Sequence, residues 1–123
     1  MKIAYISDIH SNLEALETSL QEISRQDVDH VYCLGDIVGY GADPNACIDL
    51  IREVADGAIA GNHDSAAVGL TSTEHFNSFA QAAIRWTDER LTESNRQYLK
   101  NLPLICSNDS VFCVHATPIA PEK

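Results

Sequence analysis

The chain has 123 residues, 45% of them hydrophobic, and a formal net charge of -10 at pH 7, which fits one globular domain, residues 1–123. The acidic balance excludes an extended nucleic-acid-binding surface, which needs a face of Lys and Arg, and a basic membrane-surface helix. No stretch approaches the ~20 apolar residues of a membrane span, and the apolar start ends at Asp8, too early for a signal peptide, so we expect a cytoplasmic protein.

Strand and helix patterns alternate through the first half of the chain. Helical periodicity runs from about residue 12 to residue 26. Ser11 and Glu14 form a capping box at the start of this helix. A second helix follows Asp43, with Pro44 at its first position. This alternation predicts an α/β fold with a parallel sheet flanked by helices. The expected strands are residues 2–6, 30–34 and 57–60.

The second half predicts two helices and a hairpin. The helices are expected at residues 73–91 and 92–102, and Pro103 ends the second. Antiparallel strands at 104–107 and 111–114 turn near 108–110, and a terminal loop begins at residue 117. Cys106 and Cys113 face each other across this hairpin as free thiols, because a cytosolic disulfide is rare. The helix at 73–91 is expected to bury one stripe of side chains, which consists of Phe76, Phe79, Ala80, Ala83 and Ile84.

Polar side chains follow each expected strand at the point where it ends. In an open α/β sheet the strands' carboxyl ends form a crevice where ligands bind. Carboxylate, amide and imidazole groups suit hard or borderline divalent metals. The pattern therefore predicts a metal centre, with two metals sharing a carboxylate. The residues are Asp8, His10, Asp36, Asn62, His63, Asp64 and His115.

Each of these signals has an ordinary structural explanation when it is taken alone. Asp8 and His10 can be loop polar residues, and Asp36 can be an N-cap or Asx-turn residue. His63 can be a ligand or a general acid. The neighbouring Asp64 can orient its imidazole and raise its pKa. The order of the four clusters, each at a strand end, favours the metal centre.

The four clusters together resemble the calcineurin-like metallophosphoesterase superfamily, whose pattern is D-x-H, G-D, G-N-H-D/E and a strand-terminal His. The match is closest to small bacterial phosphodiesterase-like members, through G-D-I-V-G-Y-G at 35–41 and D-P-N at 43–45. The resemblance implies a metallophosphoesterase-type sheet core. It also implies that Asp8 and His10 bind one metal, Asn62 and His115 bind the other, and Asp36 bridges both. His63, supported by Asp64, would protonate the leaving alkoxide or contact the phosphate.

The family's last motif, G-H-x-H, is missing, since no His follows His115. By this comparison we interpret the chain as a C-terminally truncated member with an incomplete second sheet. Each metal then lacks one His ligand, which would weaken metal binding. The expected cofactors are two divalent ions, with Mn favoured over Fe, Zn, Ni or Co.

Two functions are open. The first is hydrolysis of small phosphodiesters by a hydroxide that bridges the two metals. All eight basic residues lie away from the four loops, so no Arg is placed to grip a phosphate, which disfavours a protein phosphatase. Tyr40 either lines the site entrance or packs against a helix. The alternative is an inactive metal-binding or chain-pairing module, which forms a homo-oligomer through exposed sheet edges.

Overall fold

The structure is a computed structural model that describes residues 1–107 and 110–117. Its main sheet has three parallel strands in the order β1-β2-β3. They are β1 (Ile3–Ile6), β2 (His30–Cys33) and β3 (Gly57–Ala58). Each boundary lies within two residues of its expected position, and the predicted α/β fold with a parallel sheet is confirmed.

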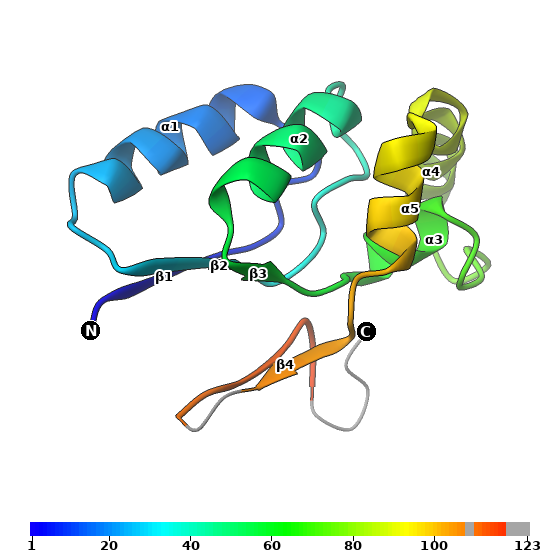
Figure 1. The fold of residues 1–123 in the computed structure, drawn as a ribbon. Coiled ribbons are helices and arrows are strands. Elements are labelled where there is room, and N and C mark those ends of the chain that lie inside the picture. The colour runs from blue at the N-terminus through cyan, green and yellow to red at the C-terminus, as the bar shows by residue number, and fades with distance from the viewer. Residues whose placement is uncertain (108–109, 118–123) are drawn as a thin grey trace.

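Two helices cover one face of this sheet, α1 (Leu13–Ser24) and α2 (Pro44–Val54) (Figure 1). Pro44 is the first residue of α2, as predicted. The predicted capping box of α1 is wrong. The Asn12 side chain caps the helix instead, because its oxygen accepts from the Ala15 N–H at 3.1 Å, while Ser11 is buried in a left-handed conformation.

Three further helices stand beyond the carboxyl end of β3: α3 (Asn62–Ala67), α4 (Ser78–Arg90) and α5 (Glu93–Lys100) (Figure 1). The sequence did not indicate α3. The expected start of α4 at residue 73 is wrong, because Asn77 caps the helix by accepting from the Ala80 N–H at 2.9 Å. Phe79 is 83% exposed, so its place in the buried stripe is wrong, whereas Ala80 and Ile84 are buried.

The hydrophobic core lies between the sheet and the helices and extends into the loop after β2. Ile48 and Ile51 of α2 and Leu99 of α5 all belong to this core. The loop residues Ile37 and Val38 are also fully buried. The loop that carries Asp36 is therefore held by core packing, which fixes the position of its backbone.

A hairpin of β4 (Ile105–Ser107) and β5 (Phe112–Val114) lies against the other face of the sheet (Figure 1). Cys106 pairs with Cys113 across it and both are free thiols, as predicted. The predicted turn falls partly at 108–109 and the terminal loop mostly at 118–123, outside the described residues. Within the described part of the chain, no helix has the length and apolar character needed to cross a membrane. The cytoplasmic location stays a prediction.

Candidate metal centre

The loops after β1 and β2 run side by side at the carboxyl end of the sheet. The Asp8 N–H donates to the Gly35 carbonyl at 3.0 Å, and the His10 N–H donates to the Asp36 carbonyl at 2.9 Å. Asp8, His10 and Asp36 all have positive φ, between 48° and 57°. Left-handed backbone at several non-glycine residues is strained and is typical of functional sites.

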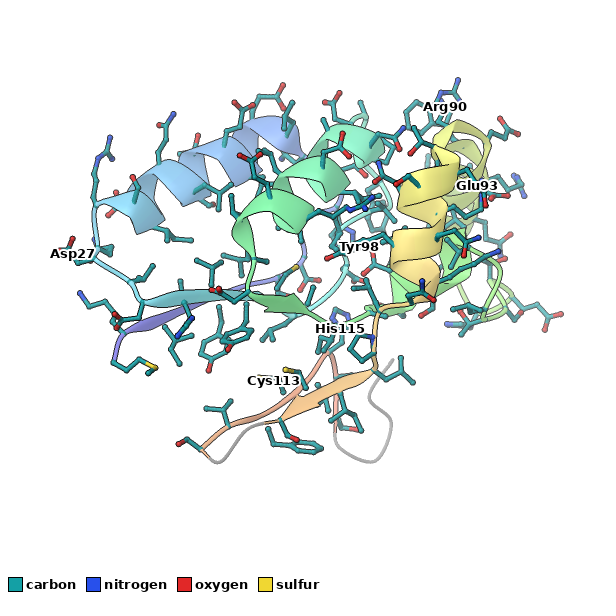
Figure 2. All side chains as sticks on the ribbon, viewed as in Figure 1. Asp27, Arg90, Glu93, Tyr98, Cys113 and His115 are labelled. Atoms are coloured by element: carbon teal, nitrogen blue, oxygen red, sulfur yellow. The ribbon has the colours of Figure 1, made fainter. Side chains whose placement is uncertain are left out.

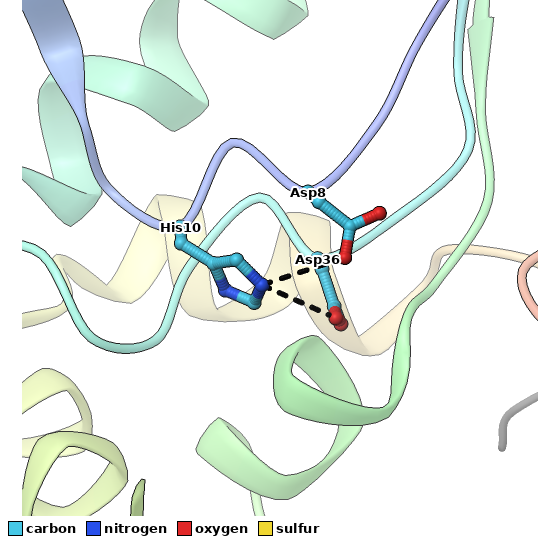
Figure 3. A group of neighbouring side chains, drawn as sticks. All are labelled: Asp8, His10 and Asp36. Atoms are coloured by element: carbon cyan, nitrogen blue, oxygen red, sulfur yellow. Dashed lines mark ion pairs between the residues drawn. The ribbon is translucent and has the colours of Figure 1, made fainter. Parts of the chain in front are cut away.

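The first ligand group consists of Asp8, His10 and Asp36, whose ligand atoms lie within 4.8 Å of one another. His10 Nε2 lies 3.5 Å from Asp8 Oδ1 and 3.5 Å from Asp36 Oδ2 (Figure 3). His10 Nδ1 lies 3.0 Å from the Val38 carbonyl oxygen, which can only accept. Nδ1 therefore donates to this carbonyl, and Nε2 points toward the two carboxylates.

The second ligand group consists of Asp36, Asn62 and His115. His115 lies on the side of the hairpin that faces the sheet (Figure 2). Its Nδ1 is 2.8 Å from the Leu34 carbonyl oxygen, and its Nε2 is 3.2 Å from Asp36 Oδ2. Here too, Nδ1 donates to a carbonyl oxygen, and Nε2 is turned toward the carboxylate of Asp36.

The carboxamide of Asn62 completes this second group. One terminal atom of the amide lies 3.2 Å from His115 Nε2 and 3.2 Å from both carboxylate oxygens of Asp36. In the absence of a cation, the favourable atom at that place is the amide nitrogen, because it can donate to the carboxylate oxygens of Asp36. In the presence of a cation, the favourable atom is the amide oxygen, because all the converging atoms then offer lone pairs.

The electrostatics of Asp36 and His115 are coupled. Burial opposes ionisation of Asp36, but the hydrogen bond and charge of His115 outweigh it and lower the pKa of the carboxyl. The hydrogen bond that His115 Nε2 donates to the Asp36 carboxylate raises the pKa of His115 to about 9. Both shifts favour a carboxylate beside an imidazolium. A divalent cation would take the place of the Nε2 proton, and the mixed oxygen and imidazole donors fit a borderline metal.

Asp64 has a different role from the one expected. It is fully buried, and its carboxylate accepts from the N–H groups of Asp36 at 2.8 Å, Gly61 at 3.0 Å and Val38 at 3.1 Å. Burial raises its pKa to about 6, although these donors oppose the shift. The predicted support of His63 by Asp64 is wrong, because neighbouring helix residues point about 100° apart. Asp64 instead joins the loop after β2 to α3.

The imidazole of His63 lies at the edge of the first ligand group. Its ring centroid is 4.9 Å from that of His10, 4.9 Å from that of Tyr40 and 4.8 Å from that of Phe76. Burial lowers the pKa of His63, so the predicted rise is wrong. The backbone N–H of His63 donates to Asp36 Oδ1 at 3.0 Å and helps to hold that carboxylate.

Two glycines allow this close packing. A Cβ atom at Gly61 would overlap the Oδ1 and backbone N of Asp36. A Cβ atom at Gly39, whose φ is +94°, would lie 2.6 Å from His63 Nδ1. The G-N-H-D and G-D-I-V-G-Y-G motifs therefore need glycine at these positions for steric reasons.

The structure thus brings all five predicted metal ligands together, with Asp36 in both groups. An open groove next to them is lined by Asp8, His10, Tyr40, Glu14 of α1 and Asp43, the residue before α2. Among the described residues, no Lys or Arg lines this groove. Sequence reasoning missed the contact of Phe76 with His63, because Phe76 was assigned to the buried face of a helix and nothing in the sequence marks its partner.

Comparisons with known proteins agree with this geometry. The model of the calcineurin-like phosphoesterase family matches residues 1–122. An uncharacterised protein of Methanocaldococcus jannaschii is 44% identical over 124 residues, which cover 98% of this chain and 51% of that protein. The crystal structure of a metallophosphoesterase from Sphaerobacter thermophilus is 41% identical, with a TM-score of 0.85, over 100% of this chain and 50% of that one.

A hypothetical protein of Pyrococcus horikoshii OT3 shares the fold, with a TM-score of 0.85 at 22% identity, over 98% of this chain and 56% of that one. The chain thus spans about half of the length of the relatives it matches. Two findings indicate the same family. The family model matches nearly the whole chain, and the chain is 41% identical to a metallophosphoesterase. The chain belongs to the calcineurin-like phosphoesterase family.

Proposed function

We propose that the chain binds two divalent metal ions and hydrolyses small phosphodiesters. The observation that supports this most is that the Asp36 carboxylate is shared by two ligand groups, each with one imidazole whose Nε2 faces it. Asp8 and His10 would hold one ion, and Asn62 and His115 the other. Mn is the favoured metal, although Fe, Zn, Ni and Co suit the same donors.

When bound, two such ions clamp a phosphoryl group and lower the pKa of a water molecule for in-line attack. The chain's own residues then have to hold and orient the side chains that bind the metal ions. The carbonyls of Leu34 and Val38 fix the two imidazoles. The buried carboxylate of Asp64 fixes the loop that carries Asp36. Phosphoryl transfer depends mostly on such positioning and on charge stabilisation.

His63 would act on the substrate side of the site. Because burial lowers its pKa, the imidazole is mainly neutral near pH 7 before substrate binds. A neutral imidazole still has one N–H, which can donate to a phosphate oxygen or to the leaving oxygen. We propose this role for His63 and a structural role for Asp64.

The charge of the groove favours a phosphodiester substrate. A phosphodiester carries one negative charge, whereas a phosphomonoester carries up to two. Besides the proposed ligand Asp8, the carboxylates of Glu14 and Asp43 line the groove, and no Lys or Arg among the described residues does so. A dianion would be repelled more strongly than a monoanion there.

The test is Mn-dependent hydrolysis of bis-p-nitrophenyl phosphate by the wild-type chain and by Asp36→Ala. We expect turnover by the wild type that rises with Mn and a loss of it in the variant. Glu53→Ala is the matched control, because Glu53 is an exposed carboxylate on α2, away from the site. Equal turnover by wild type and Asp36→Ala would contradict the proposed two-metal mechanism.

The second candidate function is a metal-binding, chain-pairing module without activity. It is favoured by the outer face of the hairpin, where Ile105 is 42% exposed and Phe112 is 54% exposed. Apolar side chains on a two-stranded sheet invite pairing with another copy. Light scattering of the purified chain, together with the hydrolysis assay, distinguishes the two functions. A concentration-dependent dimer without hydrolysis supports the pairing module, and an active monomer excludes it.

A further inference from the structure

Asp64 does not orient His63, so other groups have to hold this imidazole. The Nδ1 atom of His63 is buried and has no hydrogen-bond partner. A hydrogen bond to Nδ1 is the usual means of fixing a catalytic imidazole. The position of this ring therefore depends on packing, and the packing partners can be identified.

Phe76 provides the largest flat contact. Its ring lies 4.8 Å from the His63 ring, centroid to centroid, and the two planes are only 23° apart. The other neighbours meet the imidazole at steeper angles, 42° for Tyr40 and 76° for His10. Next to Nδ1, the close approach of the Gly39 backbone leaves no room even for a Cβ atom.

Phe76 is itself held by the segment that precedes α4. Its backbone N–H donates to the Thr73 carbonyl at 2.9 Å. The Gln81 side chain donates to the carbonyl of Phe76 at 2.9 Å and to that of Thr73 at 3.0 Å. The half-buried ring of Phe76 also packs against the hydrophobic core. A ring anchored in this way can fix a partner that lacks hydrogen bonds at Nδ1.

We propose that Phe76 is the positioning residue of His63: its ring, together with the close approach of Gly39 to Nδ1, holds the imidazole plane and leaves Nε2 as the nitrogen available to the substrate. The consequence for hydrolysis rests on the proposed function, whereas the control of the imidazole conformation by Phe76 does not.

The first experiment measures the conformation of His63 by NMR in the metal-free chain. In the wild type we expect a nuclear Overhauser contact between the His63 ring and the Hα protons of Gly39. Phe76→Ala should lose it. Phe76→Leu keeps the apolar bulk, so it should fold, but it lacks the flat surface and should weaken the contact. Phe79→Ala is the matched control, because Phe79 lies three residues away and is 83% exposed.

The second experiment measures Mn-dependent hydrolysis of bis-p-nitrophenyl phosphate in a double-mutant cycle. Phe76→Ala should lower kcat roughly threefold to tenfold, the effect of one aromatic pair, with KM and Mn content unchanged. In a His63→Ala background the same substitution should cause no further loss, because Phe76 would act only through His63. Phe79→Ala should match wild type in both backgrounds.

Retention of the Gly39–His63 contact in Phe76→Ala would overturn the inference, as would an equal loss of kcat in both backgrounds. Absence of hydrolysis in the wild type would count against the proposed function alone. In that case the NMR experiment still decides whether Phe76 holds His63.

Discussion

Replacing Asp64 by Ala tests the role that the structure gives to this carboxylate. Asp64 accepts three backbone N–H groups, from Asp36, Gly61 and Val38, and is itself fully buried. A buried donor left without an acceptor costs about 1–3 kcal/mol. Some of this is offset, because a buried carboxylate is no longer desolvated. We therefore expect Asp64→Ala to lower the free energy of unfolding by about 3–5 kcal/mol.

Asp64→Asn is expected to be intermediate. Its amide oxygen can take the place of Oδ2, which accepts from Asp36 and Gly61, but its NH₂ group then faces the Val38 N–H. One hydrogen bond of three is lost, so the expected cost is about 1–3 kcal/mol. The order of stability should be wild type, then Asp64→Asn, then Asp64→Ala.

The assay is urea unfolding of the metal-free chain, followed by far-ultraviolet circular dichroism. The exposed carboxylate of Glu53 supplies the control, since Glu53→Ala should stay within about 0.5 kcal/mol of wild type. A change of less than about 1 kcal/mol in Asp64→Ala, together with a loss of hydrolysis, would refute this reasoning. That result would instead support the role expected from the sequence, in which Asp64 orients the imidazole of His63.

Three further predictions concern the glycine motif, the metal and the thiols. Gly61→Ala should lose Mn binding by equilibrium dialysis and unfold at lower urea concentration, because the new Cβ would overlap Asp36; unchanged Mn binding would contradict the packing. Added Mn should stabilise the wild-type chain by about 2.7 kcal/mol for each bound ion at a hundred times its Kd, measured as a rise in Tm, but should not stabilise Asp36→Ala. A thiol assay of the unfolded, unreduced chain should find all four cysteines reactive, whereas two reactive cysteines would indicate a Cys106–Cys113 disulfide.

The three strands and the meeting of the five candidate ligands could be predicted because both depend on short-range patterns. A short apolar run followed by a polar residue predicts a strand and its end. Parallel strands then bring their carboxyl ends to one edge of the sheet. For this reason Asp8, Asp36 and Asn62, separated by 26 residues or more, could be predicted to meet at one site.

The errors concern features that depend on tertiary contacts. A helical period cannot tell Phe76, which turns toward His63, from Phe79, which faces solvent. The start of α4 was missed because a side-chain cap by Asn77 overrides the apolar pattern that begins before it. Asp64 was assigned to its neighbour in sequence, His63. Its actual partners include backbone groups 26 and 28 residues away, which no local motif reveals.

The most direct test of the shared Asp36 carboxylate is the Mn content of the chain, measured by mass spectrometry of dialysed protein. We predict two Mn ions per wild-type chain, one in His10→Ala, one in His115→Ala and none in Asp36→Ala. The exposed-site variant Glu53→Ala should bind as the wild type does. Full Mn binding by Asp36→Ala, or the loss of both ions in either single histidine variant, would contradict two sites joined by one carboxylate.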